Sequence, residues 1–113
     1  YRSISIMMPM KLLKFVGSSL NDLRSFPEEV RREAGFQLDA VQRGGMPSDF
    51  KPMLNIGTGA YEIRLHIKGE WRIIYVAKMA DVIYVLHAFQ KKTQKTRRED
   101  IELAIRRYRQ IGD

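Results

Sequence analysis

The sequence predicts an α+β domain, in which a small, largely antiparallel sheet of about four strands carries two N-terminal helices on one face and is followed by a C-terminal helix. Apolar residues that alternate or run continuously predict strands within residues 61–89. Apolar residues spaced three and four apart predict helices before and after that stretch. Because 113 residues suit one domain, we expect residues 11–113 to form it and residues 1–10 to be a flexible lead.

The first half of the chain is expected to hold one short strand and two helices. Lys11 to Val16 is the strand, and Ser18 or Ser19 then offers a hydroxyl to cap a brief helix. Pro27 ends that helix, because proline lacks an N–H group, and a longer helix runs from Pro27 to Arg43. Its apolar stripe consists of Val30, Ala34, Leu38 and Val41. Two glycines at positions 44 and 45 follow it, as is common at helix ends.

The second half is expected to supply most of the sheet. Met46 to Ala60 holds two Pro and two Gly and is expected to be a long irregular loop, a kind of segment that often carries function. Tyr61 to Ile67 alternates and forms a hairpin with Trp71 to Val76. Val82 to Phe89 is nearly all apolar, which predicts a central strand covered on both faces.

A capping box of Thr96 and Glu99 predicts the start of the closing helix. With two helices on one face of the sheet, we expect the opposite face to be largely uncovered. That face carries Arg64 and His66, so it is predicted to be concave and basic.

The composition excludes several classes of protein. Hydrophobic residues make up 44% and charged residues 29% of the chain, which argues against global disorder. The absence of cysteine excludes disulfides, thiolate metal sites and a cysteine nucleophile, and it suits a reducing compartment such as the cytoplasm. The longest apolar run, Val82 to Leu86, is far shorter than the roughly 20 residues of a membrane helix.

The positive charge is concentrated in one part of the sequence. The net charge is +7, and residues 60–98 contain nine of the basic residues against three acidic ones. Such a cluster attracts polyanions such as nucleic acid or an anionic membrane surface, although a solvated face that only keeps the protein soluble has the same composition.

The residues suggest phosphate chemistry rather than a metal or nucleotide enzyme. No Walker loop, dinucleotide fingerprint, Ser-His-Asp set or zinc motif is present, and two histidines without cysteine argue against a structural zinc. Cleavage of RNA by its own 2′-hydroxyl requires a base, positive charge on the phosphorane and an acid. Arg64 and Arg72 would face each other across the hairpin and supply that charge, unless they are ordinary solvent-exposed cations.

Four other side chains have both a structural and a functional interpretation. His87 is either a core residue of the central strand or a proton-transfer group, and His66 is either a solvated residue on the polar face near a turn or a functional side chain. Tyr75 is either a core residue or a platform on which a base stacks, and Lys51 is either a solvated or an RNA-binding loop lysine.

Three motifs connect these residues to a known family. The segments Gly59 to Arg64, Trp71 to Tyr75 and Leu86 to Thr96 resemble the RelE/ParE toxin superfamily, specifically its phage-derived HigB-like branch. The last of them contains the string HAFQKKTQKT, which is highly specific for the branch. Shorter similarities at residues 17–19, 26–31 and 49–52 extend the resemblance over residues 11–110.

The resemblance implies the toxin of a type II toxin–antitoxin pair. Such toxins enter the ribosomal A site and cleave translated mRNA to a 2′,3′-cyclic phosphate, without metal or cofactor. The implied partners are the ribosome, mRNA and a small helix-turn-helix antitoxin of the HigA kind, and no membrane is involved.

The resemblance also assigns roles to residues. Arg64 matches a basic strand residue, Arg72 matches the arginine on the scissile phosphate, and Lys91 and Lys92 match a cation at the end of the last strand. The expected catalytic set is Arg64, Arg72, His87 and Lys91, and the expected RNA-binding set is Lys51, Lys92, Lys95 and Tyr75.

The chain departs from RelE at two positions. Glu62 replaces a second hairpin lysine, and no counterpart of the C-terminal tyrosine of RelE follows Lys92. The general base is therefore open between Glu62, His87 and Lys51.

Two alternatives to the nuclease remain. One is a ParE-like gyrase poison, against which the cations Lys91 and Lys92 argue, and the other is a phage remnant that binds RNA or an antitoxin without cleaving.

Overall fold

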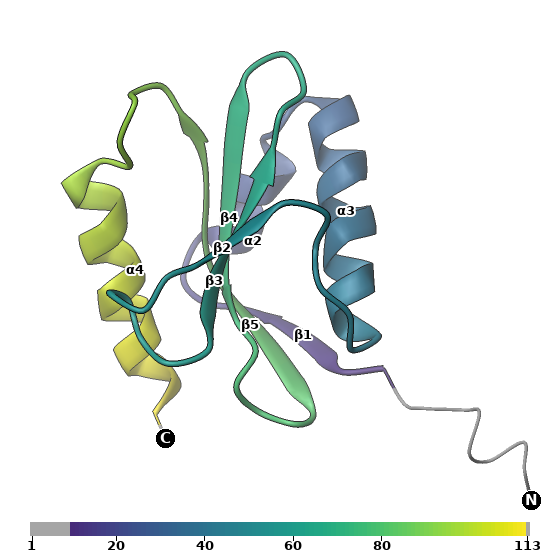
Figure 1. The fold of residues 1–113 in the computed structure, drawn as a ribbon, viewed down its shortest axis with the longest axis vertical. Helices are drawn as coiled ribbons and strands as arrows, with labels where there is room; N and C mark the ends of the chain where they lie inside the picture. The colour runs from purple at the N-terminus through teal and green to yellow at the C-terminus, as the bar shows by residue number, and fades with distance from the viewer. Residues whose placement is uncertain (1–9, 113) are drawn as a thin grey trace, which may run out of the picture.

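The computed structural model describes residues 10–112, so the expected N-terminal lead lies outside the described residues except for Met10. The chain forms one mixed sheet with helices on both sides (Figure 1). The strands are β1 (Leu12–Phe15), β2 (Phe50–Pro52), β3 (Ala60–Leu65), β4 (Glu70–Val76) and β5 (Val82–Lys91), in the order β1-β5-β4-β3-β2. The helices are α2 (Ser19–Arg24), α3 (Glu28–Gln42) and α4 (Arg98–Ile111). The predicted α+β class is confirmed.

The sheet has five strands rather than about four. The extra strand is β2, which lies within the segment predicted to be an irregular loop and pairs antiparallel with β3. Its three residues are too few for alternation to be recognised in the sequence. All ladders are antiparallel except the one that joins β1 to β5.

One face of the sheet lies under α2 and α3 and holds the first core. The apolar stripe predicted for α3 is buried there with Phe26 and Trp71, whose rings lie 4.9 Å apart. Helix α3 begins at Glu28, one residue after its predicted start at Pro27. Ser18 is the N-cap residue of α2, but its hydroxyl does not make the predicted cap hydrogen bond. Ser18 and Ser19 donate to Asp22 and to the carbonyl of Val85, respectively.

The opposite face was expected to be largely uncovered, but α4 covers part of it (Figure 1). A second core lies between α4 and this face, and it includes Ile74, Val76, Leu86 and Ala104. The predicted capping box does not start α4. The helix is capped at Arg97 without a side-chain bond, and Thr96 instead lies 3.5 Å from Glu62.

A β-bulge in β5 changes which residues face α4. Tyr75 pairs with Val85 but the preceding Ile74 pairs with His87, so Leu86 is an extra residue on β5. Leu86 and His87 therefore follow one another while both are buried on the side of α4.

Candidate active site

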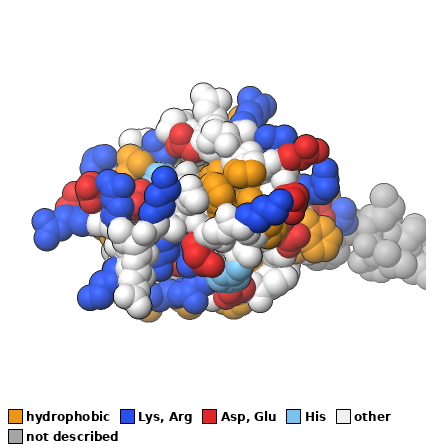
Figure 2. Space-filling model, turned by 90° about the horizontal axis from the view of Figure 1, so that it is seen from above, with side chains coloured by type: hydrophobic (Ala, Val, Ile, Leu, Met, Phe, Trp, Pro, Cys, Tyr) orange, Lys and Arg blue, Asp and Glu red, His pale blue; other side chains and the backbone are white. Residues whose placement is uncertain are grey.

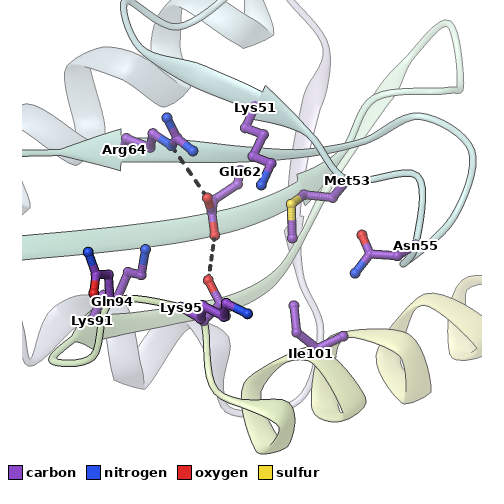
Figure 3. Close-up of a pocket in the computed structure, with 10 residues that line it drawn as sticks. Lys51, Met53, Asn55, Glu62, Arg64, Lys91, Gln94, Lys95 and Ile101 are labelled. Carbon is purple, nitrogen blue, oxygen red and sulfur yellow. Dashed lines mark hydrogen bonds and ion pairs between the residues drawn. The ribbon is translucent and has the colours of Figure 1, made fainter.

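A cavity of about 460 Å³ lies beside the N-terminal end of α4, where that helix no longer covers the sheet (Figure 3). Its lining combines four cations, one carboxylate, two carboxamides and an apolar end. The lining residues are Lys51, Met53, Asn55, Glu62, Arg64, Lys91, Gln94, Lys95, Thr96 and Ile101. The predicted site residues Lys51, Arg64, Lys91 and Lys95 are thus brought together.

The strand register explains this arrangement. Lys51, Glu62, Ile74 and His87 form one row across β2, β3, β4 and β5, and Arg64, Arg72 and Phe89 form the next. The predicted pairing of Arg64 with Arg72 across the hairpin is confirmed. Because side chains alternate along a strand, Glu62 and Arg64 share the face that α4 partly covers.

Glu62 is the most unusual member of the site, because it is a carboxylate with only 2% of its surface exposed. Its Oε1 lies 3.6 Å from Nε of Arg64 and 3.7 Å from Nε of Arg72. Neither Nε atom has a hydrogen-bond partner in the described structure. The two guanidinium groups therefore balance the charge of Glu62 at ion-pair distance.

Arg72 does not line the cavity, contrary to its expected place on a phosphate. Its side chain is only 6% exposed, and it contacts Glu70 at 2.9 Å and donates to the carbonyl of Trp71 at 3.0 Å. Arg64, with 34% of its side chain exposed, is the hairpin arginine that reaches the cavity.

His66 lies at the edge of the site between two carboxylates. Its Nε2 is 2.6 Å from Asp49 and its Nδ1 is 2.9 Å from Glu70. The hydrogen bonds to Asp49 first, and then to Glu70, raise the pKa of His66 above its usual value of 6.5. The bond from His66, followed by Arg72, lowers the pKa of Glu70.

His87 is buried at the start of α4 and does not line the cavity. Its Nε2 lies 2.7 Å from Asp100, and its ring stacks on Phe89 with centroids 4.6 Å apart. Its Nδ1 is buried and has no hydrogen-bond partner among residues 10–112. The side chain of Ile74 occupies the register position between His87 and Glu62.

Tyr75 is not in a position to contact RNA, so its expected role in binding is corrected. It lies on the sheet face under α2 and α3, has no exposed surface and stacks on Tyr61 with ring centroids 5.6 Å apart. Burial raises the pKa of its hydroxyl, which has no hydrogen-bond partner in the part of the chain that the structure describes. Lys92 is exposed but lies outside the cavity lining.

Several lining residues were not identified from the sequence. Asn55 lies in the loop that was suspected of function, whereas Gln94 and Thr96 lie in the basic segment after β5. Their residue types alone do not mark them as functional. They lie together only because the loop after β2 and the segment after β5 meet at the cavity. Glu62 was considered only because it departs from the family pattern.

The surface around the site is basic but mixed. Seen from above, Lys and Arg side chains gather mainly on the left, the side of α4, with acidic side chains among them (Figure 2). Within residues 10–112, no group of three or more His, Asp or Glu could hold a metal ion. No helix in the same range is long and apolar enough to cross a membrane.

Comparisons with known proteins give a family and a fold. A family described as "Phage derived protein Gp49-like" matches residues 21–109. A structure of a double mutant of the E. coli toxin RelE in the free state is similar, with a TM-score of 0.67 and 18% identity. The similarity covers 87% of this chain and 97% of that one. Among curated proteins, none matches the sequence significantly.

Proposed function

The chain belongs to the phage-derived Gp49-like family, and on this premise we propose that it is the toxin of a type II toxin–antitoxin pair that cleaves mRNA on the ribosome. The family match and the RelE-like fold confirm the resemblance to the RelE/ParE superfamily. Membership of its HigB-like branch stays a prediction.

The single observation that carries the proposal is a buried carboxylate surrounded by cations in an open cavity. Glu62 provides a proton acceptor, and Lys51, Arg64, Lys91 and Lys95 line the same space. Positive groups in fixed positions stabilise the charge that develops on a phosphorane, and the arginine fork also fits phosphate oxygens. A protein–protein poison has no need of such a cavity.

The proposed reaction uses the 2′-hydroxyl of the RNA as nucleophile. Glu62 accepts the 2′-hydroxyl proton, the 2′-oxygen forms a bond to phosphorus, and the bond from phosphorus to the 5′-oxygen breaks. The ammonium of Lys91 gives its proton to that leaving oxygen. We assign this proton to Lys91 rather than His87, because His87 is bound to Asp100 and does not line the cavity. The products are a 2′,3′-cyclic phosphate and a 5′-hydroxyl.

The finer parts of the proposal concern the partners. Translated mRNA in the ribosomal A site is the substrate, which places the activity in the cytoplasm, and a HigA-like helix-turn-helix antitoxin is the inhibitor. Arg72 supports the charge of Glu62 from within the protein, and Lys92 contributes to RNA binding outside the cavity.

The test adds purified, antitoxin-free protein to a cell-free translation reaction and maps the 5′ ends of a reporter mRNA by primer extension. New ends that form only in the translated sample, and not in a ribosome-free control, support the proposal. The new 3′ ends should resist phosphatase until acid opens the cyclic phosphate. Intact mRNA together with DNA broken by gyrase would replace the proposal with the ParE-like alternative.

A further inference from the structure

A chain of three contacts leads from His66 at the molecular surface to the carboxylate of the active site. His66 lies 2.6 Å from Asp49 and 2.9 Å from Glu70. Oε1 of Glu70 lies 2.9 Å from Nη2 of Arg72, and Nε of Arg72 lies 3.7 Å from Glu62. The exposure falls along the chain, from 51% for the side chain of His66 to 3% for that of Glu62. A titration at the surface is thus connected to a buried group through charged side chains.

Both contacts of His66 are hydrogen bonds only in its protonated form. Asp49 and Glu70 are acceptors, whereas a neutral imidazole donates from one nitrogen. Loss of the proton therefore leaves one carboxylate against a lone pair. Arg64 on β3 and Glu33 on α3 are the other charged groups along the cavity of about 330 Å³ that His66 and Asp49 line.

Arg72 is shared between two carboxylates. Glu70 forms an ion pair with Nη2 of Arg72 at 2.9 Å, whereas Glu62 lies 3.7 Å from Nε of Arg72. This Nε has no hydrogen-bond partner among the described residues. When His66 is charged, it neutralises part of Glu70, so more of the charge of Arg72 remains for Glu62. When His66 is neutral, Glu70 competes for Arg72 at full charge.

We propose that His66 is a positioning residue, which acts through Glu70 and Arg72 on Glu62 and makes cleavage fall as the pH rises. The part that concerns cleavage rests on the proposed nuclease function. The coupling between His66 and Arg72 does not, because it is a property of the folded protein alone.

The coupling is tested by NMR titration of the histidine Hε1 protons in the full chain. The sequence has only two histidines, and His66→Gln identifies the resonance of His66 by its loss. Arg72→Gln should raise the titration midpoint of His66 by about 0.5 pH unit, because the charge of Glu70 is then no longer shared with Arg72 and stabilises only the protonated His66. Glu70→Gln, at a half-exposed position, should lower it.

The control for the NMR titration is Lys68→Gln. This variant removes a cation of the same hairpin that contacts Glu29 instead of Glu70, so the midpoint should move much less than in Arg72→Gln. A midpoint of His66 that is the same in Glu70→Gln and the wild type overturns the inference, even if Arg72→Gln does not fold.

The effect on cleavage is tested by the ratio of wild-type to His66→Gln rates over a range of pH in the translation assay. We expect this rate ratio to be about 10 at a pH below the titration midpoint of His66 and near 1 at a pH well above it. The value of 10 is smaller than the ~10²-fold loss of rate that a 1 Å misplacement of a reacting group causes. A ratio that does not change with pH means a merely structural role and overturns the coupling to cleavage. Absence of cleavage by the wild type instead contradicts the proposed function, and the NMR result stands independently.

Discussion

The sheet face on the side of α4 has two halves, which are built from the same strands but have different roles. Under α4, Ala60, Ile74 and Val76 are buried among apolar side chains. Beyond the end of α4, the same strands β3 and β4 carry Glu62, Arg64, Glu70 and Arg72, and His66 directly follows β3. The change occurs within two residues of one strand, between Ala60 and Glu62.

Stability and function thus depend on different parts of the same sheet face. The apolar half gains free energy from burial, whereas the charged half pairs buried groups that lose their hydration. Two guanidinium Nε atoms there lack hydrogen-bond partners, which is uncommon for buried polar groups. Four substitutions test this division, and they follow in order of decreasing expected effect.

Glu62→Gln should lower the rate of mRNA cleavage about 10²- to 10⁴-fold, because the variant retains the shape but loses the proton acceptor. Arg72 keeps Glu70 as a partner, so we expect the variant to fold. Primer extension in the translation assay measures the rate, and Glu102→Gln on the exposed side of α4 is the matched control. Wild-type cleavage by Glu62→Gln would exclude Glu62 as the base.

Leu86→Ala should lower the free energy of unfolding by about 2–5 kcal/mol, because Leu86 is fully buried in the core beneath α4. Urea denaturation measures this loss. The cleavage rate per folded molecule should stay close to that of the wild type. A large loss of rate in fully folded protein would show that the two halves are not separable.

Arg64→Gln should weaken binding of a single-stranded RNA and reduce the slope of log affinity against log salt by about 0.7 to 1, the effect of one lost phosphate contact. Fluorescence anisotropy at several salt concentrations measures the slope. Arg32→Gln, on the exposed surface of α3, should leave it unchanged. Equal slopes for the two variants would contradict a phosphate site at Arg64.

His66→Gln should produce the smallest effect, a loss of unfolding free energy of less than about 1 kcal/mol, because the ion pairs of His66 are half exposed. The raised pKa of His66 gives stability that is complete below about 6.5 and lost as the pH rises through the folded pKa. The lowered pKa of Glu70 gives stability above about 4.5 that is lost as the pH falls. The difference from wild type should thus be largest between these values and decrease as the pH rises through the folded pKa of His66, which urea denaturation across pH can check.

The periodicity of apolar residues in the sequence was enough to predict the longer helices and strands. The stripe of α3 and the hairpin of β3 and β4 were predictable, because a continuous pattern identifies each of them. The position of α4 was not, since an amphipathic helix shows which of its faces is buried but not which sheet face it covers.

The candidate site was predictable only in part. The cations Arg64 and Lys91 follow from charge and motif, whereas the burial of Arg72 depends on Glu70 and Glu62, and a single strand does not show these contacts. The interpretation of Tyr75 as core was the correct one of the two that the sequence allowed.

The extra residue Leu86 changes which positions of β5 face each side of the sheet. Before the bulge the odd-numbered Ile83 and Val85 face the core under α2 and α3, and after it the even-numbered Ala88 does so. The strand therefore changes phase in its middle. This phase change turns His87 and Lys91 toward the side of α4 and the cavity. Deletion of Leu86 would therefore restore a uniform alternation and leave His87 and Lys91 on the side of α4. A strand that kept Leu86 but lost the bulge would instead turn both of them toward the core under α2 and α3.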